Sequence, residues 1–210
     1  MKISERRDYS DEPIRKSALQ PNPFDQLHNW MDEAILREVL EPNAMILATV
    51  SKNGRPSTRT VLFKELDDRG LVFYTNTESR KAHDIADNPW VSLTILWLEF
   101  PRQILISGTI EPISRDRAKD YFSQRPRRSQ IGASASRQGE ILQSRKELER
   151  KMHDIEKRYE GQEIPIPEDW GGYCVVPETF EFWHGRRDRI HDRFLYVQES
   201  GEWVIKRLSP

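Results

Sequence analysis

The chain has 210 residues, of which 36% are hydrophobic and 32% are charged, and its formal net charge at pH 7 is −1. This length suits one domain, and the balanced charge excludes an overall field that would draw the protein to nucleic acid or to an anionic membrane. The single cysteine, Cys174, excludes an intrachain disulfide and is typical of a reducing compartment. The modest apolar fraction also predicts that part of the apolar surface is buried against a second subunit.

Residues 1–22 are polar and lack periodicity, so we expect a flexible N-terminal arm, followed by a single domain over residues 23–210. No apolar stretch follows the charges of the arm, and no run approaches membrane-spanning length, so we expect a cytoplasmic protein. Asn22 and Pro23 predict the start of a helix, because asparagine caps helices and proline suits the first helical position. Apolar residues then recur at helical spacing, and Pro42 ends that helix.

From Ala44 onward the pattern changes to short apolar or alternating runs separated by turn residues, which predicts strands. Asn53-Gly54 is a strong signal for a tight turn between the first two of them. The expected strands are residues 45–50, 57–66, 71–75, 90–98, 102–111, 172–176, 179–184, 192–199 and 203–208. The expected inserted helices are residues 79–87, 114–124 and 140–160.

This succession of elements predicts a mainly β, α+β fold in the form of an antiparallel barrel or sandwich with helical decoration. A doubly wound parallel sheet needs regular alternation of strands and helices, which the chain lacks.

One run near the C-terminal end, residues 182–193, mixes an aromatic ring, two imidazoles and several guanidinium groups. If the segment is extended, Arg189, His191 and Arg193 lie on one side of it. Guanidinium groups fork onto phosphate or stack on a ring, and imidazole titrates near neutral pH, so the row suits a planar anionic ligand. An exposed edge strand protected by charges explains the same residues equally well.

Three other cationic clusters allow two interpretations each. Arg59 and Lys64 stand in an otherwise apolar strand, on opposite faces by simple alternation, and either bind ligands or reach solvent from an edge. Ser79, Arg80 and Lys81 follow Tyr74-Thr75-Asn76 at a helix start, which favours anions but is common. The third cluster suits phosphate or, less well, nucleic acid, and it comprises Tyr121, Arg125, Arg127, Arg128 and Ser129.

Several common site types lack sequence support. No cysteine pair is present, and His184 and His191 lack metal-ligand spacing, so we expect no metal. The chain has no Gly-x-Ser-x-Gly turn, no P-loop and no glycine-rich dinucleotide loop. The cationic clusters therefore favour a β-scaffold that binds two phosphate-bearing small molecules.

Several short motifs follow one another in a joint order that is more specific than any one of them. These are Arg59–Lys64, Phe73–Asn76, Ser79–Ala82, Ser123–Pro126, Ser129–Ala133, Trp170–Gly172, Phe182-Trp183, Arg189–Phe194 and the C-terminal Arg-Leu-Ser-Pro. In this order of motifs the chain resembles the pyridoxine/pyridoxamine 5′-phosphate oxidase family from about Arg6 to Pro210.

The resemblance implies an FMN-binding split β-barrel and a homodimer with one FMN in each of two interface clefts. It further implies oxidation of pyridoxine and pyridoxamine 5′-phosphates to pyridoxal 5′-phosphate, with O2 as acceptor and H2O2 as product, and no nucleic-acid or membrane partner. The implied cofactor-binding residues are Arg59, Thr60, Val61, Leu62, Phe63, Lys64, Tyr74, Thr75, Arg80, Lys81, Gln103, Gln138, Gly139, Trp183 and Arg193. The implied substrate-binding residues are Arg6, Tyr9, Lys64, Tyr121, Arg125, Ser129, Arg189, Ile190 and His191, with Arg189 and His191 as the catalytic pair.

The chain departs from the family pattern in two places. Gly139 replaces a serine that follows the glutamine, so we expect one hydroxyl contact to FMN to be lost and Gly139→Ser to tighten FMN binding. Asp11-Glu12-Pro13 replaces glycines of the arm, which bears on whether Arg6 and Tyr9 close over the substrate. The alternative is a split-barrel flavin or pyridoxal-phosphate binding protein without turnover, since one fold serves several functions.

Overall fold

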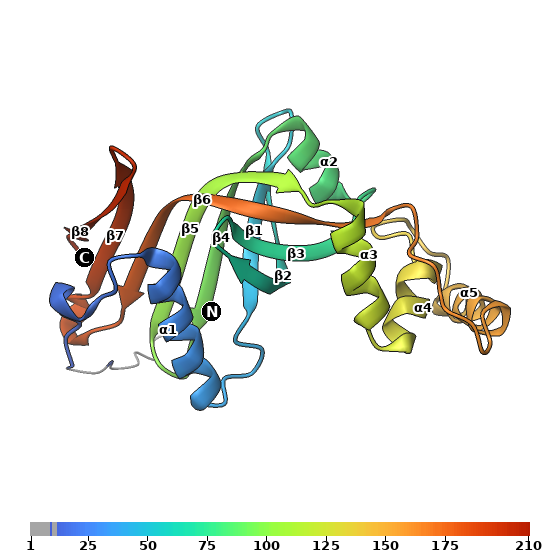
Figure 1. Ribbon diagram of the computed structural model, residues 1–210, viewed down its shortest axis with the longest axis horizontal. Coiled ribbons are helices and arrows are strands. Elements are labelled where there is room, and N and C mark those ends of the chain that lie inside the picture. Colours follow the sequence, from blue (N-terminus) through green and yellow to red (C-terminus); the bar gives the residue numbers. More distant parts are fainter. Residues whose placement is uncertain (1–8, 10–11) are drawn as a thin grey trace, which may run out of the picture.

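Six antiparallel strands close into a barrel in the computed structural model, which describes residue 9 and residues 12–210 (Figure 1). The strand order is β3-β2-β1-β4-β5-β6, a further pairing of β3 with β6 closes the ring, and β7 and β8 continue the sheet beyond β6. The predicted mainly β split-barrel fold is therefore confirmed. The elements are η1 Lys16–Ala18, α1 Pro23–Leu36, β1 Ala44–Val50, β2 Pro56–Asp67, β3 Gly70–Asn76, α2 Arg80–Asp87, β4 Trp90–Trp97, β5 Arg102–Pro112, α3 Arg115–Gln124, α4 Arg127–Ala135, α5 Arg145–Arg158, β6 Trp170–His184, η2 Arg187–Arg189, β7 Asp192–Glu199 and β8 Glu202–Leu208.

Strand β6 runs from the end beside α3 to β7 and belongs to both parts of the sheet (Figure 1). Its first residues pair with β3, its last residues pair with β7, and β5 pairs with it between Tyr173 and His184. The prediction of two separate strands, 172–176 and 179–184, was wrong. The register shifts opposite Ser107 and Gly108, so the strand continues through Pro177 at a bulge. Bulges are positions where a strand tolerates a residue that lacks a backbone N–H donor.

Two glycines allow the barrel to close tightly against β6. A Cβ atom added at Gly70 would lie 1.7 Å from the carbonyl oxygen of Val175, and one at Gly108 would lie 2.1 Å from that of Val176. No side chain fits at either position, so the backbones approach directly.

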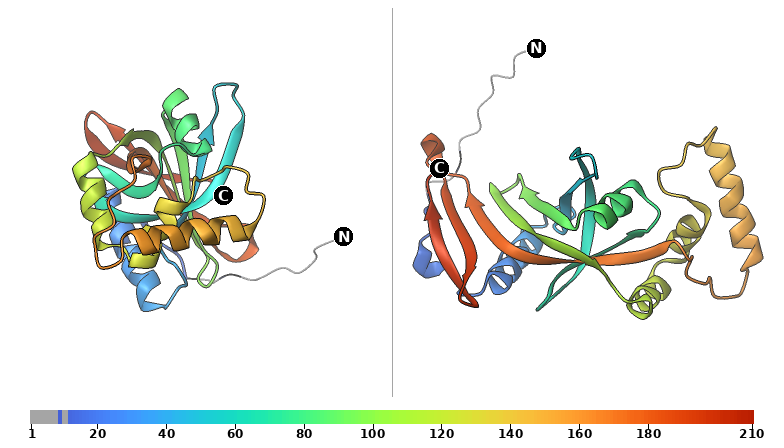
Figure 2. Two further views of the ribbon diagram at one scale, coloured as in Figure 1. Left: turned by 90° about the vertical axis from the view of Figure 1, so that its right-hand side faces the viewer. Right: turned by 90° about the horizontal axis from the view of Figure 1, so that it is seen from above.

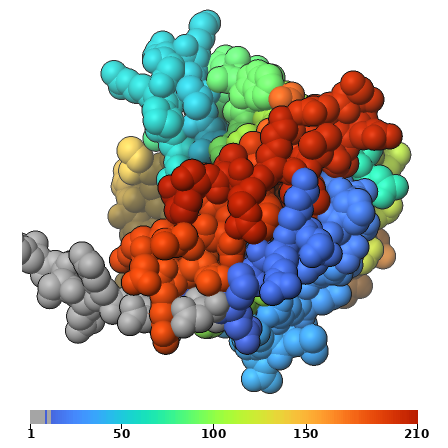
Figure 3. Space-filling model, turned by 90° about the vertical axis from the view of Figure 1, so that its left-hand side faces the viewer, coloured from blue at the N-terminus to red at the C-terminus, as the bar shows by residue number. Residues whose placement is uncertain are grey.

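Helix α1 begins as predicted and covers the second half of β6. The side chain of Asn22 accepts a hydrogen bond from the Phe24 amide at 2.9 Å, and Trp30 packs edge-on against Phe182 with ring centroids 5.1 Å apart. The segment before α1 lies beside β7, as Figure 3 shows, because the Ile14 amide donates to Asp192 at 3.0 Å. The division of the chain at residue 22 stays a prediction.

Helices α3, α4 and α5 form a lobe at the end of the molecule opposite to β7 and β8 (Figure 2). Helix α4 was not predicted, and α5 begins at Arg145 rather than at residue 140. The sequence of α4 shows no helical repeat of apolar residues, because only Gln130 and Ile131 on this helix are buried. The Gln130 amide donates to the carbonyls of Phe122, Ser123 and Arg125, which joins α4 to the end of α3. No helix in the described part of the chain is long and apolar enough to span a membrane.

Candidate active site

A cavity of about 610 Å³ opens beside β2, between the end of β3, the start of α2 and the end of α3. Most of the residues predicted for a cofactor or a substrate line it, although they come from segments far apart in the sequence. The predicted residues that line this cavity are Arg59, Thr60, Val61, Leu62, Lys64, Tyr74, Thr75, Arg80, Lys81, Tyr121, Arg125, Gln138 and Gly139.

Arg59 and Lys64 both line the cavity, although simple alternation along a strand had suggested opposite faces. The register between β2 and β3 shifts between Phe63 and Glu65, so an extra residue is inserted at Lys64. Such a bulge breaks the period of two and re-aims the side chain, a feature often found beside active sites. Phe63 points the other way and is buried in the barrel core.

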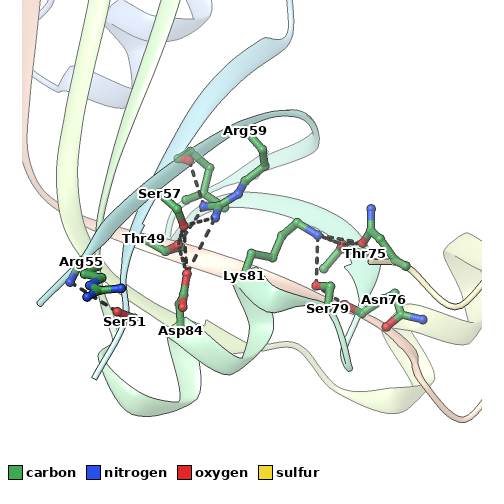
Figure 4. A network of polar contacts seen from close by, with 12 residues as sticks. Thr49, Ser51, Arg55, Ser57, Arg59, Thr75, Asn76, Ser79, Lys81 and Asp84 are labelled. Carbon is green, nitrogen blue, oxygen red and sulfur yellow. Dashed lines mark hydrogen bonds and ion pairs between the residues drawn. The ribbon is translucent and has the colours of Figure 1, made fainter. Parts of the chain in front are cut away.

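The guanidinium group of Arg59 is fixed by a buried network centred on Asp84 (Figure 4). Asp84 accepts hydrogen bonds from Thr49 at 2.7 Å and from Ser57 at 3.0 Å, and Arg59 donates to both hydroxyl groups. Hydrogen bonds from these hydroxyls and the nearby cations hold the pKa of Asp84 below its usual range despite burial. The network therefore presents a preformed cation at the cavity wall.

Lys81 lies at the start of α2 with its ammonium group turned toward the cavity. Its Nζ donates to Gln138 at 2.7 Å and to Thr75 and Ser79 at 3.0 Å, which occupies all three of its donors with neutral acceptors (Figure 4). Burial, with a smaller contribution from the charge of Arg59, lowers the pKa of Lys81 to about 8. A bound anion would restore the missing counter-charge.

Aromatic rings form the other wall of the cavity. Tyr74 stacks on Tyr121 with ring centroids 3.8 Å apart and planes within 5°, and Trp170 lies parallel to both. The guanidinium group of Arg125 stands 5.0 Å from the Trp170 ring, and its Nη1 is buried with no hydrogen-bond partner among the described residues. A buried donor without a partner is costly, so Arg125 is suited to an anionic ligand.

A second group of predicted residues lies at the far end of β6. Gln103, Trp183 and Arg193 stand side by side in one row across β5, β6 and β7. Arg193 is paired with Glu181, at 2.7 Å and 3.0 Å, and this pairing raises its pKa. The ring of Tyr9 packs against those of Trp183 and His191, with centroids 6.1 Å and 5.9 Å away.

The row of Arg189, His191 and Arg193 expected on one extended strand is not formed. β7 begins only at Asp192, and Arg189 belongs to the short helix η2, where it and Asp188 have positive φ angles of 64° and 54°. The tight loop presents Arg189 and Ile190 outward, and Ile190 is 68% exposed. The strand interpretation failed because the loop needs a left-handed backbone that alternation does not reveal.

The two groups of residues cannot meet within one copy of the chain. Trp170 lines the cavity and Trp183 belongs to the second group, yet both lie on the single strand β6. Thirteen residues of extended chain cover about 43 Å along the strand, and β6 runs from the end beside α3 to β7 without turning back (Figure 1).

Ser129 and Arg6 are the remaining predicted residues, and Asp84 is a residue of the site that was not predicted. Ser129 lies on α4 outside the cavity lining, and Arg6 lies outside the described residues. Asp84 was not predicted, although its position three residues after Lys81 on an amphipathic helix is a signal that could have identified it. In the described part of the chain, no group of three or more His, Cys, Asp or Glu side chains is arranged to hold a metal ion.

Comparisons with known proteins agree over nearly the whole chain. The family model described as pyridoxamine 5′-phosphate oxidase matches residues 31–159, and that described as the pyridoxine 5′-phosphate oxidase C-terminal dimerisation region matches residues 170–210. The pyridoxine/pyridoxamine 5′-phosphate oxidase of Rubrobacter xylanophilus is 47% identical over 205 residues, which cover 98% of this chain and 94% of that protein. The enzyme of the same description from Nostoc punctiforme is 46% identical over 206 residues, covering 98% and 96%.

Solved structures show the same fold. PhzG from Burkholderia lata, in complex with tetrahydrophenazine-1-carboxylic acid, superposes with a TM-score of 0.89 at 30% identity and covers 96% of this chain and 100% of its own. A pyridoxamine 5′-phosphate oxidase-related FMN-binding protein from Nostoc punctiforme has a TM-score of 0.73 at 18% identity, with coverages of 91% and 100%.

Proposed function

The chain belongs to the pyridoxine/pyridoxamine 5′-phosphate oxidase family, and we propose that its active site combines the cavity beside β2 with the Trp183–His191 group of a second copy. Its activity is the FMN-dependent oxidation of pyridoxine 5′-phosphate and pyridoxamine 5′-phosphate to pyridoxal 5′-phosphate. A flavin-binding protein without turnover is not supported, because relatives described as oxidases share 46–47% identity over 98% of the chain.

The cavity has the size and chemistry that FMN needs. Its volume of about 610 Å³ lies within the usual range for ligand pockets. Arg80 and Lys81 at the start of α2 and Arg59 on β2 supply cations around a helix start, where a phosphate group is favoured, and no carboxylate of the described residues pairs with the buried Lys81. In this assignment the strand segment from Arg59 to Lys64, with Tyr74, Thr75, Gln138 and Gly139, holds the rest of the cofactor.

The substrate's phosphate group is assigned to the opposite side of the same cavity. Lys64, Tyr121 and Arg125 converge there, and the Nη1 of Arg125, which has no partner in the part of the chain that the structure describes, is suited to a phosphate oxygen. Ser129 is assigned to the same group, from the first turn of α4 that follows Arg125.

The second copy supplies the residues that face the reacting carbon. When bound, FMN supplies the two-electron acceptor for oxidation at the 4′-carbon of the substrate. Arg189 is placed on an exposed loop where its guanidinium group can offset charge that develops on the pyridine ring. The Nδ1 atom of His191 accepts a hydrogen bond from the Arg186 amide, so its Nε2–H is left to donate to the substrate's oxygen substituent. Gln103, Trp183 and Arg193 are assigned to the flavin edge.

The main observation in support of a site shared by two copies is the length of β6 between Trp170 and Trp183. The match of residues 170–210 to a dimerisation region supports the same arrangement. The test is complementation: Arg125→Ala damages the cavity and Arg189→Ala damages the other group, and the two variants are co-expressed with different tags. Activity is measured at a substrate concentration far below KM, where a raised KM and a lowered kcat both appear as lost activity. Random pairing should restore about a quarter of the wild-type activity, because half of the dimers are mixed and each mixed dimer has one intact site of two. If the purified mixed dimer is as inactive as both parents, the two groups act within one copy and the proposal is wrong.

A further inference from the structure

An ion pair outside the cavity joins helix α3 to the hairpin of β2 and β3. The guanidinium group of Arg117 on α3 contacts Glu65 through Nη2 at 2.5 Å and through Nε at 3.0 Å. The same Nη2 reaches Asp67 at 2.9 Å, so one arginine binds two carboxylates of β2. These hydrogen bonds raise the pKa of Arg117.

The pair also reaches the aromatic wall of the cavity. The hydroxyl group of Tyr74 donates to the second oxygen of Glu65, and the Tyr74 ring is the one on which Tyr121 stacks at 3.8 Å. Tyr121 follows Arg117 by one helical turn on α3, so both ends of the connection lie on the same face of that helix. Glu65 therefore binds the helix directly and orients one of its rings through Tyr74.

The residues assigned to the substrate's phosphate group come from both of the elements that this pair joins. Lys64 directly precedes Glu65 at the bulge of β2, whereas Tyr121 and Arg125 belong to α3 and to its C-terminal cap. The distance between Lys64 and Arg125 thus depends on how α3 sits against the hairpin. The side chains of Arg117 and Glu65 are 32% and 37% exposed, so the pair itself contributes little to overall stability.

We propose that Glu65 and Arg117 are positioning residues that hold Tyr121 and Arg125 in place against Lys64 for recognition of the substrate's phosphate group. This inference rests on the proposed function of the cavity. Neither residue contacts the ligand in this proposal, and both act through the side chains that do. Their loss should therefore weaken the binding of the phosphorylated substrate far more than that of FMN, whose phosphate group is assigned to other cations, and it should leave the chemical step unchanged.

The test is steady-state kinetics of the FMN-loaded enzyme with pyridoxamine 5′-phosphate, for Glu65→Gln, Arg117→Gln and the double variant. We expect KM to rise roughly five- to twentyfold in each single variant, the range of couplings carried through a packed network, with kcat within about twofold of wild type. The inhibition constant of inorganic phosphate should rise in parallel, and the flavin content should stay normal. Lys119→Gln, which removes an exposed cation from the same helix, is the matched control and should leave KM unchanged.

The double variant separates a connected pair from two independent effects. Because Arg117→Gln already removes the direct contact between helix and hairpin, adding Glu65→Gln should raise KM by much less than Glu65→Gln does alone, and Arg117→Lys should give an intermediate KM. An unchanged KM in both single variants, a fall in kcat at constant KM, or additive effects in the double variant would each overturn the inference. Failure of the proposed function would appear differently, as a wild-type enzyme without oxidase activity or as failed complementation.

Discussion

The backbone amide of Arg186 donates a hydrogen bond to Nδ1 of His191 at 3.1 Å. An imidazole nitrogen that accepts a hydrogen bond carries no proton, so the neutral ring holds its proton on Nε2. The loop that turns through Asp188 and Arg189 with positive φ angles brings Arg186 and His191 together. A main-chain group thus determines the atom with which His191 can donate.

The first prediction distinguishes donation from Nε2 from donation from Nδ1. Glutamine places an amide nitrogen near the position of Nε2, whereas asparagine places one near Nδ1. His191→Gln should therefore keep a kcat/KM for pyridoxamine 5′-phosphate about tenfold higher than that of His191→Asn, the upper end of a hydrogen bond's net worth. Equal losses in both variants, or a more active asparagine variant, would assign the donor to the other nitrogen.

The second prediction concerns the acid side of the pH profile. Burial, followed by the charges of Arg189 and Arg193, lowers the pKa of His191 from its usual value of 6.5. Protonation places a second proton on Nδ1, facing the Arg186 amide, and breaks their hydrogen bond. We expect kcat/KM to be constant across neutral pH and to decline only below 6.5, and we expect His191→Gln to lack that decline. A midpoint above 6.5 in the wild-type enzyme would contradict this assignment.

The third prediction concerns the affinity of FMN at alkaline pH. The pKa of Lys81 is about 8 in the protein without cofactor, and a bound phosphate group raises it by supplying the missing counter-charge. Below pH 8 the lysine is already charged, so FMN affinity should be constant. Above pH 8 binding must take up a proton, so affinity should fall by up to about tenfold per pH unit. Fluorescence titrations with riboflavin, which has no phosphate group, should show no such fall, and a flat FMN curve up to pH 9.5 would refute the assignment.

The fourth prediction separates substrate binding from the chemical step. Lys64 and Arg125 are assigned to the substrate's phosphate, so neutralising either should mainly raise KM. Arg189 is assigned to developing charge, so Arg189→Ala should lower kcat on the order of a hundredfold while retaining its flavin. Arg193→Ala should instead lose flavin, which the ratio of absorbance at 450 nm to that at 280 nm measures. Normal turnover by Arg189→Ala would remove it from the catalytic pair.

The fifth prediction reverses the expectation for Gly139. Its φ angle is 97°, which side chains of L-residues rarely adopt, so Gly139→Ser should not tighten FMN binding as the sequence had suggested. We expect it to lower the free energy of unfolding by about 1 kcal/mol or more. Gly132→Ser is the matched control, because a Cβ atom at either glycine meets no atom within 4 Å and only Gly139 has a positive φ. Melting temperatures and FMN titrations of both variants measure the difference. A Gly139→Ser variant that binds FMN more tightly and is as stable as the wild type would restore the original expectation.

The sequence by itself determined the elements that depend on short-range patterns of apolar, capping and turn residues. The strands from Ala44 to Asn76, the helix cap at Asn22 and the turn at Asn53-Gly54 all follow from local spacing and turn chemistry. The family motifs likewise identified the cations of the cavity. Chemistry pointed to Arg59 and Lys64 independently, because guanidinium and ammonium groups within an apolar strand need an anion or solvent.

Only the tertiary structure decided which of these residues meet. The bulge at Lys64 turns its side chain toward the same cavity as that of Arg59. Asp84 is the centre of the Arg59 network because it contacts Arg59 and Thr49, which lie 25 and 35 residues earlier in the chain. Strand β6 is unbroken and so separates Trp170 from Trp183. Local periodicity had predicted two strands, 172–176 and 179–184, in its place. Strand register and bulges are set by pairing between distant segments, and the proposed site shared by two copies depends on their association, so neither appears in the spacing of neighbouring residues.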